Sequence, residues 1–146
     1  MSAWRRKALA LFPDHRADIT RTDDLALNEL FFRLLMDAER AHAAEVTDPA
    51  ASLALQRIHG FAEWCMHQGG ELWRKAAIGF YEDLFHTAPW EAIVPWLSPF
   101  AIEQIEATWA LGVSGEHRPR FEQMVRERRA HKYRDHVYGT REIEAL

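Results

Sequence analysis

Histidine and glutamate residues recur at four-residue spacing in two stretches of the chain. His59, Glu63 and His67 form one series, and Glu82 and His86 repeat the spacing further on. Residues four apart share one face of a helix, and imidazole and carboxylate groups are ligands of zinc and other first-row metals. One hypothesis is therefore a metal-dependent helical enzyme that uses these five residues. It predicts stoichiometric bound metal that is lost on His67→Ala.

The helical phase of the same residues favours a different interpretation. With Ile58 at the centre of the apolar face, the three residues of the first series fall on the opposite, polar side. The two residues of the second series also lie opposite the apolar side chains of their stretch. Glu39 and His42 add a single Glu-x-x-His pair, whereas a di-iron bundle needs two such pairs and two further glutamates. We therefore expect a solvated or partner-facing polar surface, with no metal and no cofactor.

Nucleophilic catalysis has little support in the sequence. Cys65 is the one cysteine among 146 residues, which excludes an internal disulfide. It lies on an apolar helical stripe, where a free cysteine is usually a small buried hydrophobe. No G-x-S-x-G motif is present, and Ser98 is better explained as a helix cap. No catalytic residue is predicted.

The elements that carry these residues are expected to be helices. The chain is 48% hydrophobic and 27% charged, as in an ordinary globular domain, and no useful stretch alternates like a strand. Helical periodicity predicts segments over 2–11, 22–44, 49–68, 71–86, 98–111 and 119–133, with shorter turns after Pro13 and at 90–94. The unequal lengths favour an all-α, compact bundle of five or six helices with irregular or orthogonal packing. We expect one domain over 1–146, with 116–146 as a basic C-terminal helix and tail.

Short motifs mark the helix boundaries. Asp48-Pro49 and Ser98-Pro99 each place an N-cap before a proline at the first helical position, and Thr22 with two following aspartates is a further start signal. Gly69-Gly70 ends one helix and Ala88-Pro89 ends the next. The helix between these two stops is apolar around so much of its circumference that it should lie near the centre of the bundle.

Charge is distributed unevenly along the chain. Residues 1–117 carry 10 Lys and Arg against 17 Asp and Glu, and residues 118–146 carry 8 against 5. An acidic body favours a basic partner. Acidic residues interleave with the basic tail, so docking on the acidic body is favoured over a nucleic-acid contact. No apolar stretch is long enough to span a membrane, and the N-terminal one is too short for a signal peptide, so we expect a cytoplasmic protein without a membrane partner.

Two of the six tryptophans, Trp90 and Trp96, lie in the irregular connection from Pro89 to Pro99. Their indole rings either wedge this connection against the bundle or present an aromatic anchor to a partner. Tryptophan suits the second role because it offers a large contact area at little cost in conformational entropy. The sequence leaves both alternatives open.

Four motifs occur in a fixed order along the chain: LFPD at 11–14, FAEWC at 61–65, FYEDL at 80–84 and PWLS at 95–98. Over residues 9–112 the chain resembles a family of small helical bacterial proteins of unknown function. The resemblance implies a compact helical domain, and an association with immunity to secreted toxins. It brings no catalytic residues.

Fold class, charge and resemblance together predict a non-catalytic protein-binding module, an immunity-type protein that occludes a basic toxin or effector. Complementary charge speeds encounter, and a few aromatic anchors then hold the complex. The residues predicted to contact the partner are Glu63, His67, Glu82, Asp83, Trp90, Glu91 and Trp96. A third hypothesis is a helical adaptor or regulator whose basic tail contacts nucleic acid. Partner identity and oligomeric state stay open.

Overall fold

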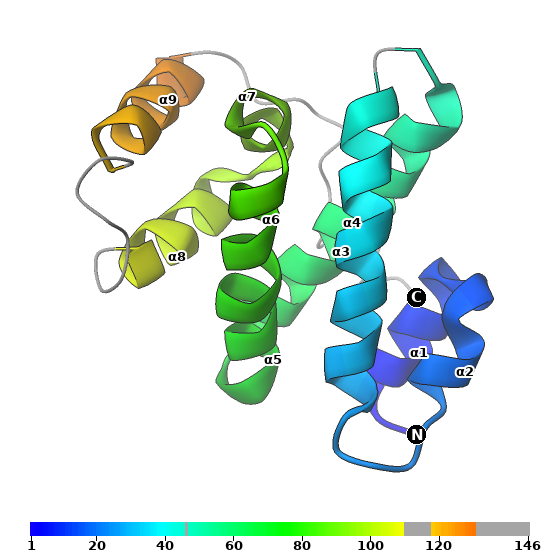
Figure 1. Cartoon of the computed structure of the whole chain (residues 1–146). Coiled ribbons are helices and arrows are strands. Elements are labelled where there is room, and N and C mark those ends of the chain that lie inside the picture. The colour runs from blue at the N-terminus through cyan, green and yellow to red at the C-terminus, as the bar shows by residue number, and fades with distance from the viewer. Residues whose placement is uncertain (46, 110–117, 131–146) are drawn as a thin grey trace.

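The computed structural model describes residues 1–45, 47–109 and 118–130, which are mostly helical and contain no strand. The elements are α1 (Ala3–Leu11), η1 (Pro13–His15), α2 (Arg16–Ile19), α3 (Ala26–Ala44), α4 (Pro49–Gln68), α5 (Gly70–Arg74), η2 (Lys75–Glu82), α6 (Asp83–Thr87), α7 (Trp90–Ile93), η3 (Val94–Trp96), α8 (Pro99–Trp109) and α9 (Arg118–Ala130). Figure 1 shows α3 standing beside the helix formed by α5 and α6, with α8 running obliquely to both. The predicted all-α bundle with irregular packing is confirmed. Residues 116, 117 and 131–146 of the predicted tail lie outside the described residues.

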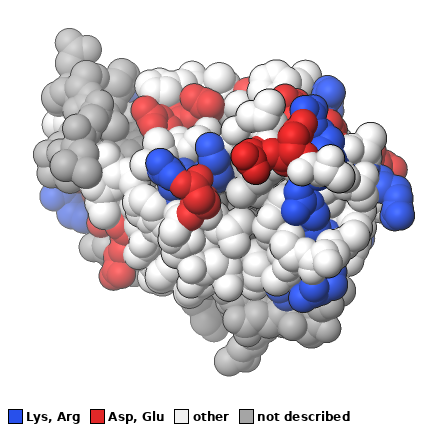
Figure 2. All heavy atoms as spheres, turned by 90° about the horizontal axis from the view of Figure 1, so that it is seen from below, with Lys and Arg blue, Asp and Glu red and all other residues white. Residues whose placement is uncertain are grey.

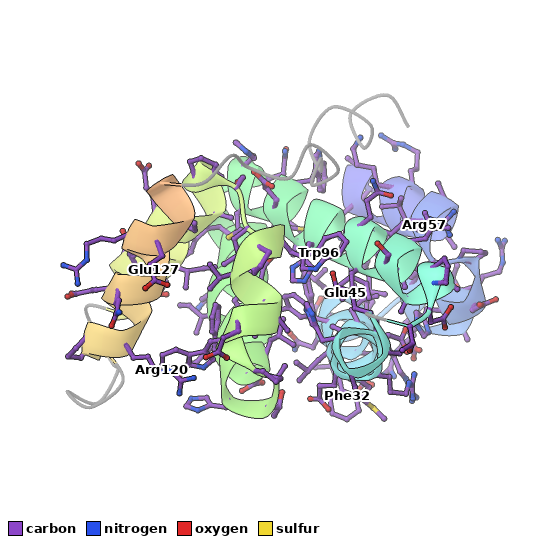
Figure 3. All side chains as sticks on the ribbon, turned by 90° about the horizontal axis from the view of Figure 1, so that it is seen from above. Phe32, Glu45, Arg57, Trp96, Arg120 and Glu127 are labelled. Atoms are coloured by element: carbon purple, nitrogen blue, oxygen red, sulfur yellow. The ribbon has the colours of Figure 1, made fainter. Side chains whose placement is uncertain are left out.

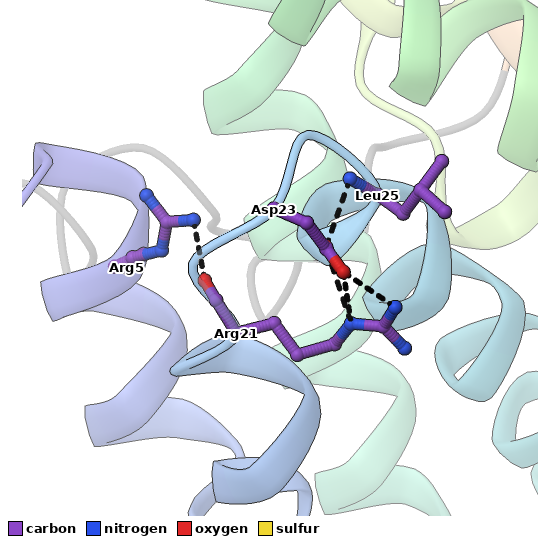
Figure 4. Close-up of polar contacts among 4 residues, drawn as sticks. All are labelled: Arg5, Arg21, Asp23 and Leu25. Atoms are coloured by element: carbon purple, nitrogen blue, oxygen red, sulfur yellow. Dashed lines mark hydrogen bonds and ion pairs between the residues drawn. The ribbon is translucent and has the colours of Figure 1, made fainter.

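Arginine side chains hold the turn between α2 and α3 (Figure 4). Arg5 donates from Nη2 to the carbonyl oxygen of Arg21 at 2.9 Å. Asp23 accepts from the side chain of Arg21 and, at 3.1 Å, from the backbone N–H of Leu25. The hydrogen bond from Arg21 lowers the pKa of the Asp23 carboxyl. Because Asp23 closes a turn instead of capping the helix, α3 begins at Ala26, later than the sequence predicts.

Both predicted ends of α4 are confirmed. The Asp48 side chain accepts a hydrogen bond from the backbone N–H of Ala50 at 2.9 Å, and Pro49 occupies the first helical position. Gly69 and Gly70 have φ of 74° and 57°, a left-handed conformation that glycine adopts without steric cost. These two residues turn the chain directly from α4 into the next helix.

The segments α5, η2 and α6 form one continuous helix, which we call the central helix. It contacts α3, α4 and α8, so its predicted central place in the bundle is confirmed. The sequence did not predict that η2 is π-helical. The buried side chains come in pairs that repeat every four residues, at Ala76 and Ala77, Phe80 and Tyr81, and Leu84 and Phe85. This period exceeds the 3.6 residues of an α-helical turn, and the wider i→i+5 turns keep the pairs on one face.

The predicted turn after Pro89 is confirmed as α7 and η3, and the capped start of α8 is also confirmed. Ser98 Oγ accepts from the backbone N–H of Ala101 at 3.0 Å. The last described helix, α9, contacts η3 and α8 through a buried Val125, and Arg120 pairs with Glu91. The predicted docking of this basic helix on the body of the protein is therefore confirmed for residues 118–130.

Ionic side chains of both signs share the surface seen from below. Figure 2 shows acidic and basic groups close together on this face, with neither sign covering it. Opposite charges also pair directly in the N-terminal half, Arg21 with Asp23 and Arg33 with Asp18. The acidic excess of residues 1–117 is therefore not gathered on this face.

Candidate partner-binding site

A groove of about 430 Å³ lies between α3 and the central helix. Phe31, Phe32 and Leu35 form its apolar part on the side of α3. Lys75, Gly79 and Asp83 line it from the central helix, and Asn28 and Glu29 complete it near the start of α3. The three residues from the central helix are spaced four apart, so they form one row along that helix. The groove is thus an apolar trough with charged groups at its ends.

Three exposed apolar side chains lie on the two helices that form this groove. Phe32 is 55% exposed and projects outward from α3 (Figure 3), and Met36, one turn later, is 39% exposed. Ile78, which precedes Gly79, is also 39% exposed. Single exposed apolar residues are ordinary, and of these three it is Phe32 that is among the described lining of the groove.

Gly79 opens a notch in the wall of the groove. Apart from its two chain neighbours and the backbone of its own helix, no described residue has a heavy atom within 4 Å of the place where a Cβ would stand. A glycine inside a helix destabilises the protein by about 0.5–1 kcal/mol relative to alanine. No packing contact in the part of the chain that the structure describes requires that glycine, and π-helical turns such as η2 are common at functional sites. The notch is therefore free to receive a side chain from another molecule.

Of the residues predicted to contact a partner, Asp83 lies in this groove, and Glu82 is exposed beside it in sequence. His86 is also exposed, so the predicted solvated face of this helix is confirmed. His67 lies elsewhere, with its ring stacked on Phe100 at 3.7 Å between centroids. Glu91 is exposed and paired with Arg120 of α9. The structure therefore does not gather these residues into one surface.

The predicted solvated face of α4 is wrong for His59 and Glu63, which are 1% and 6% exposed. α4 contacts α1, α3, α8 and the central helix, so its residues 58–66 are covered on all sides. Ser98 Oγ donates to the Glu63 carboxylate. Burial raises the pKa of the Glu63 carboxyl, and the bond from Ser98 opposes that shift. Glu63 is therefore no surface contact.

Trp90 and Trp96 are also buried, at 9% and 1% exposure, so neither indole is available as a surface anchor. Trp90 Nε1 donates to the carbonyl oxygen of Phe85 at 2.6 Å. Trp96 Nε1 donates to Glu45 at 2.9 Å, and Figure 3 shows the two side chains pointing toward one another. The alternative in which both rings wedge the connection against the bundle is confirmed.

The five residues of the metal hypothesis are not brought together. Within residues 1–45, 47–109 and 118–130, no group of three or more His, Cys, Asp and Glu side chains is placed to hold a metal ion. His59 instead uses both ring nitrogens inside the protein, with Nε2 3.0 Å from His42 Nε2 and Nδ1 2.9 Å from Tyr81 Oη. Burial lowers the pKa of both histidines, to about 4 for His42.

The sequence did not predict this buried hydrogen-bonded series of His42, His59 and Tyr81, because His42 and His59 belong to different helices. Glu45 continues it, since one of its carboxylate oxygens lies 3.8 Å from His42 Nδ1. Trp96 stacks on the ring of His59, with 5.9 Å between centroids and 14° between planes. This hydrogen-bonded series, with Glu45 and Trp96, links α3, α4, η2 and η3 through contacts in the core. The one signal in the sequence was the Glu-x-x-His pair that contains His42.

A second hollow of about 450 Å³ lies between η1, α3 and α4. His15 Nε2 lies 2.6 Å from an Asp37 oxygen, and Arg40 also binds this carboxylate. Such a pair suits a general base. No serine, threonine or cysteine is among its described lining residues. Cys65 is fully buried, as predicted, and burial raises the pKa of its thiol.

A search for relatives found none: no protein-family model, no curated protein and no solved structure matches the chain significantly. The resemblance in its motifs therefore stays a prediction. Among the described residues, no helix combines the length and apolar character needed to cross a bilayer.

Proposed function

We propose that this chain is a non-catalytic protein-binding module of the immunity type, which binds and occludes a basic toxin or effector. The observation that carries the proposal is the open groove between α3 and the central helix. It combines an exposed aromatic ring, Phe32, with an unfilled notch at Gly79 and an acidic end at Asp83. An apolar centre with a charged rim is the usual anatomy of a protein interface.

Occlusion needs no catalytic group in this chain. A partner whose active surface is basic would be drawn to the net charge of −4 and then held by apolar contacts. The expected stoichiometry is one chain for each partner molecule. The contacts expected to carry most of the binding energy are few and central, because most residues of an interface contribute little.

The test uses the full chain and two matched variants. Gly79→Leu places a side chain in the notch, and its Cβ would have open space around it. Ala43→Leu adds the same side chain at an exposed position of α3 outside the groove. Each tagged chain is purified from its host, companions are identified by mass spectrometry, and affinity is then measured with the purified companion. We expect one companion that binds the native chain and the Ala43→Leu chain alike and binds Gly79→Leu about tenfold or more weakly.

The purified companion also tests the mode of action. Its activity should fall linearly with added chain and vanish at one equivalent. A companion that binds Gly79→Leu as tightly as the native chain would exclude the groove. Inactivation of many companion molecules by one chain would show turnover and overturn the proposal of a non-catalytic module.

A further inference from the structure

The groove has the length and direction of a short helix. α3 and the central helix lie side by side and run the same way in Figure 1, and the rings of Phe31 and Phe80 lie 5.7 Å apart across their contact. The lining spans residues 28–35 on one side and 75–83 on the other. At roughly 1.5 Å per residue, the wall formed by α3 is about 10–12 Å long, which is about two helical turns. An amphipathic helix fits between two helices in this way.

The centre of the groove is apolar. The notch at Gly79 faces a lining that includes Phe32 and Leu35. An aliphatic or aromatic side chain that enters the notch would bury its own surface and part of the exposed Phe32 ring. Burial of apolar surface is the main favourable term in such contacts. A polar side chain would find few hydrogen-bonding partners at this point.

The two ends of the groove differ in charge. Because the helices run the same way, Glu29 and Lys75 lie toward the same end, where their charges offset each other. Asp83 lies toward the other end, one turn beyond Gly79, and no basic residue is among the described lining there. An exposed carboxylate in this position attracts a cation. The groove is therefore apolar at Gly79 and acidic one turn further along the central helix, at Asp83.

We propose that the occupant of the groove is an amphipathic helix of the partner, with an apolar residue in the Gly79 notch and a Lys or Arg three or four positions away at Asp83. This inference rests on the proposed function. It adds the type and the spacing of two residues of the partner. Residues three or four apart on a helix lie on one face, so both can contact the groove. The spacing of Gly79 and Asp83 on the central helix sets the spacing on the bound helix.

The test is selection from a displayed library of 16-residue amphipathic helices against the full chain. Enriched peptides should pair an apolar residue with Lys or Arg three or four positions away. Selection against Asp83→Lys should replace that basic residue by Asp or Glu, and Gly79→Leu should bind the enriched peptides about tenfold or more weakly. Glu103→Lys makes the same charge reversal at an exposed position outside the groove, and it should leave the selected pattern unchanged.

Two results would overturn the inference. One is enrichment of peptides without the paired pattern, and the other is an unchanged preference for basic residues in Asp83→Lys. These failures are distinct from failure of the proposed function. If a natural companion loses binding to Gly79→Leu while no charge exchange occurs at Asp83, the groove is the binding site but its occupant is not the helix described.

Discussion

The protons of the buried His42–His59–Tyr81 chain have one favoured order. If Tyr81 donates to His59 Nδ1, then His59 Nε2 carries a proton and donates to His42 Nε2. His42 then carries its proton on Nδ1, which faces the Glu45 carboxylate at 3.8 Å. The reverse order would point a lone pair of His42 at that carboxylate, which is repulsive. His42 Nδ1 has no other hydrogen-bond partner among the described residues.

This order predicts the tautomers of both histidines. Nitrogen chemical shifts in a ¹⁵N-labelled sample at pH 7 should report a proton on Nε2 of His59 and on Nδ1 of His42. Tyr81→Phe removes the donor to His59 Nδ1, but Glu45 still faces His42 Nδ1, so both histidines should keep these tautomers in that variant. The cost should be about 1–3 kcal/mol in the free energy of unfolding, because a buried ring nitrogen loses its partner. A proton on Nδ1 of His59 in the native chain would contradict the assigned order.

Burial of His42 also makes stability depend on pH. Its pKa is about 4 in the folded protein and about 6.5 in an unfolded chain. The unfolded chain therefore binds more protons below pH 6.5, so stability is complete above that value and falls as the pH drops toward 4. His42 alone should lower the free energy of unfolding by about 2 kcal/mol between pH 7 and pH 5, and His59 acts in the same direction.

Urea denaturation at these two pH values measures the effect. His42→Gln removes one titrating group and should reduce the loss between pH 7 and pH 5. The contribution of Glu63 is present in both chains, and it has the opposite sign because burial raises its pKa. Equal pH dependence in the native chain and in His42→Gln would show that His42 does not titrate as described.

At the scale of the elements, the sequence predicts boundaries better than faces. Local signals such as Asp48-Pro49 and Ser98-Pro99 act on the backbone beside them, and both caps form as predicted. The buried side of α4 depends on how many helices surround it. Residues 58–66 are buried without interruption. The alternation of buried and exposed positions that helical periodicity assumes is therefore lost there. The π-helical segment η2 was likewise not predicted, because its wider turns are explained by which side chains are buried together on one face.

The candidate groove was only partly predictable for a related reason. Asp83 was predicted as a contact from the charge and phase of its own helix. Phe32 and Gly79 were not, because they meet only when α3 and the central helix pack side by side. Within the run Leu30-Phe31-Phe32, the first two side chains are buried and the third is exposed. The exposure of that third residue is set by the position of α3 in the bundle.

The two caps should differ in their effect on stability. Asp48→Ala removes one exposed cap and should cost about 1 kcal/mol. Ser98→Ala removes a cap and also the hydroxyl that donates to the buried Glu63 carboxylate. A buried acceptor that loses its donor adds about 1–3 kcal/mol. Urea denaturation of both variants at pH 7 should therefore rank Ser98→Ala as clearly less stable, and equal losses would show that the bond to Glu63 contributes little.

At the scale of the whole molecule, the chain's own basic helix occupies a surface that the sequence assigned to a partner. Arg120 pairs with Glu91 and lies over the ring of Trp90 at 5.2 Å. Both Arg120 and Glu91 are mostly exposed, and exposed ion pairs contribute only about 0–1 kcal/mol. Burial of an aliphatic side chain such as Val125 contributes about 1.5–3 kcal/mol. Apolar packing therefore contributes more to the stability of the contact between α9 and the bundle than the ion pair does. The ion pair between Arg120 and Glu91 helps to orient α9.

This balance predicts that Val125→Asp releases α9 while the rest of the bundle stays folded. Backbone amides of residues 118–130 should exchange faster with deuterium, and the fluorescence of Trp90 should change as Arg120 leaves its ring. Gln123→Asp places the same carboxylate at an exposed position of α9 and should leave both signals near those of the native chain. The groove contains no residue of α7, α8 or α9 among its described lining, so Val125→Asp should bind a groove ligand unchanged. Loss of that binding would mean that α9 and the groove are coupled, and that the basic helix takes part in partner recognition.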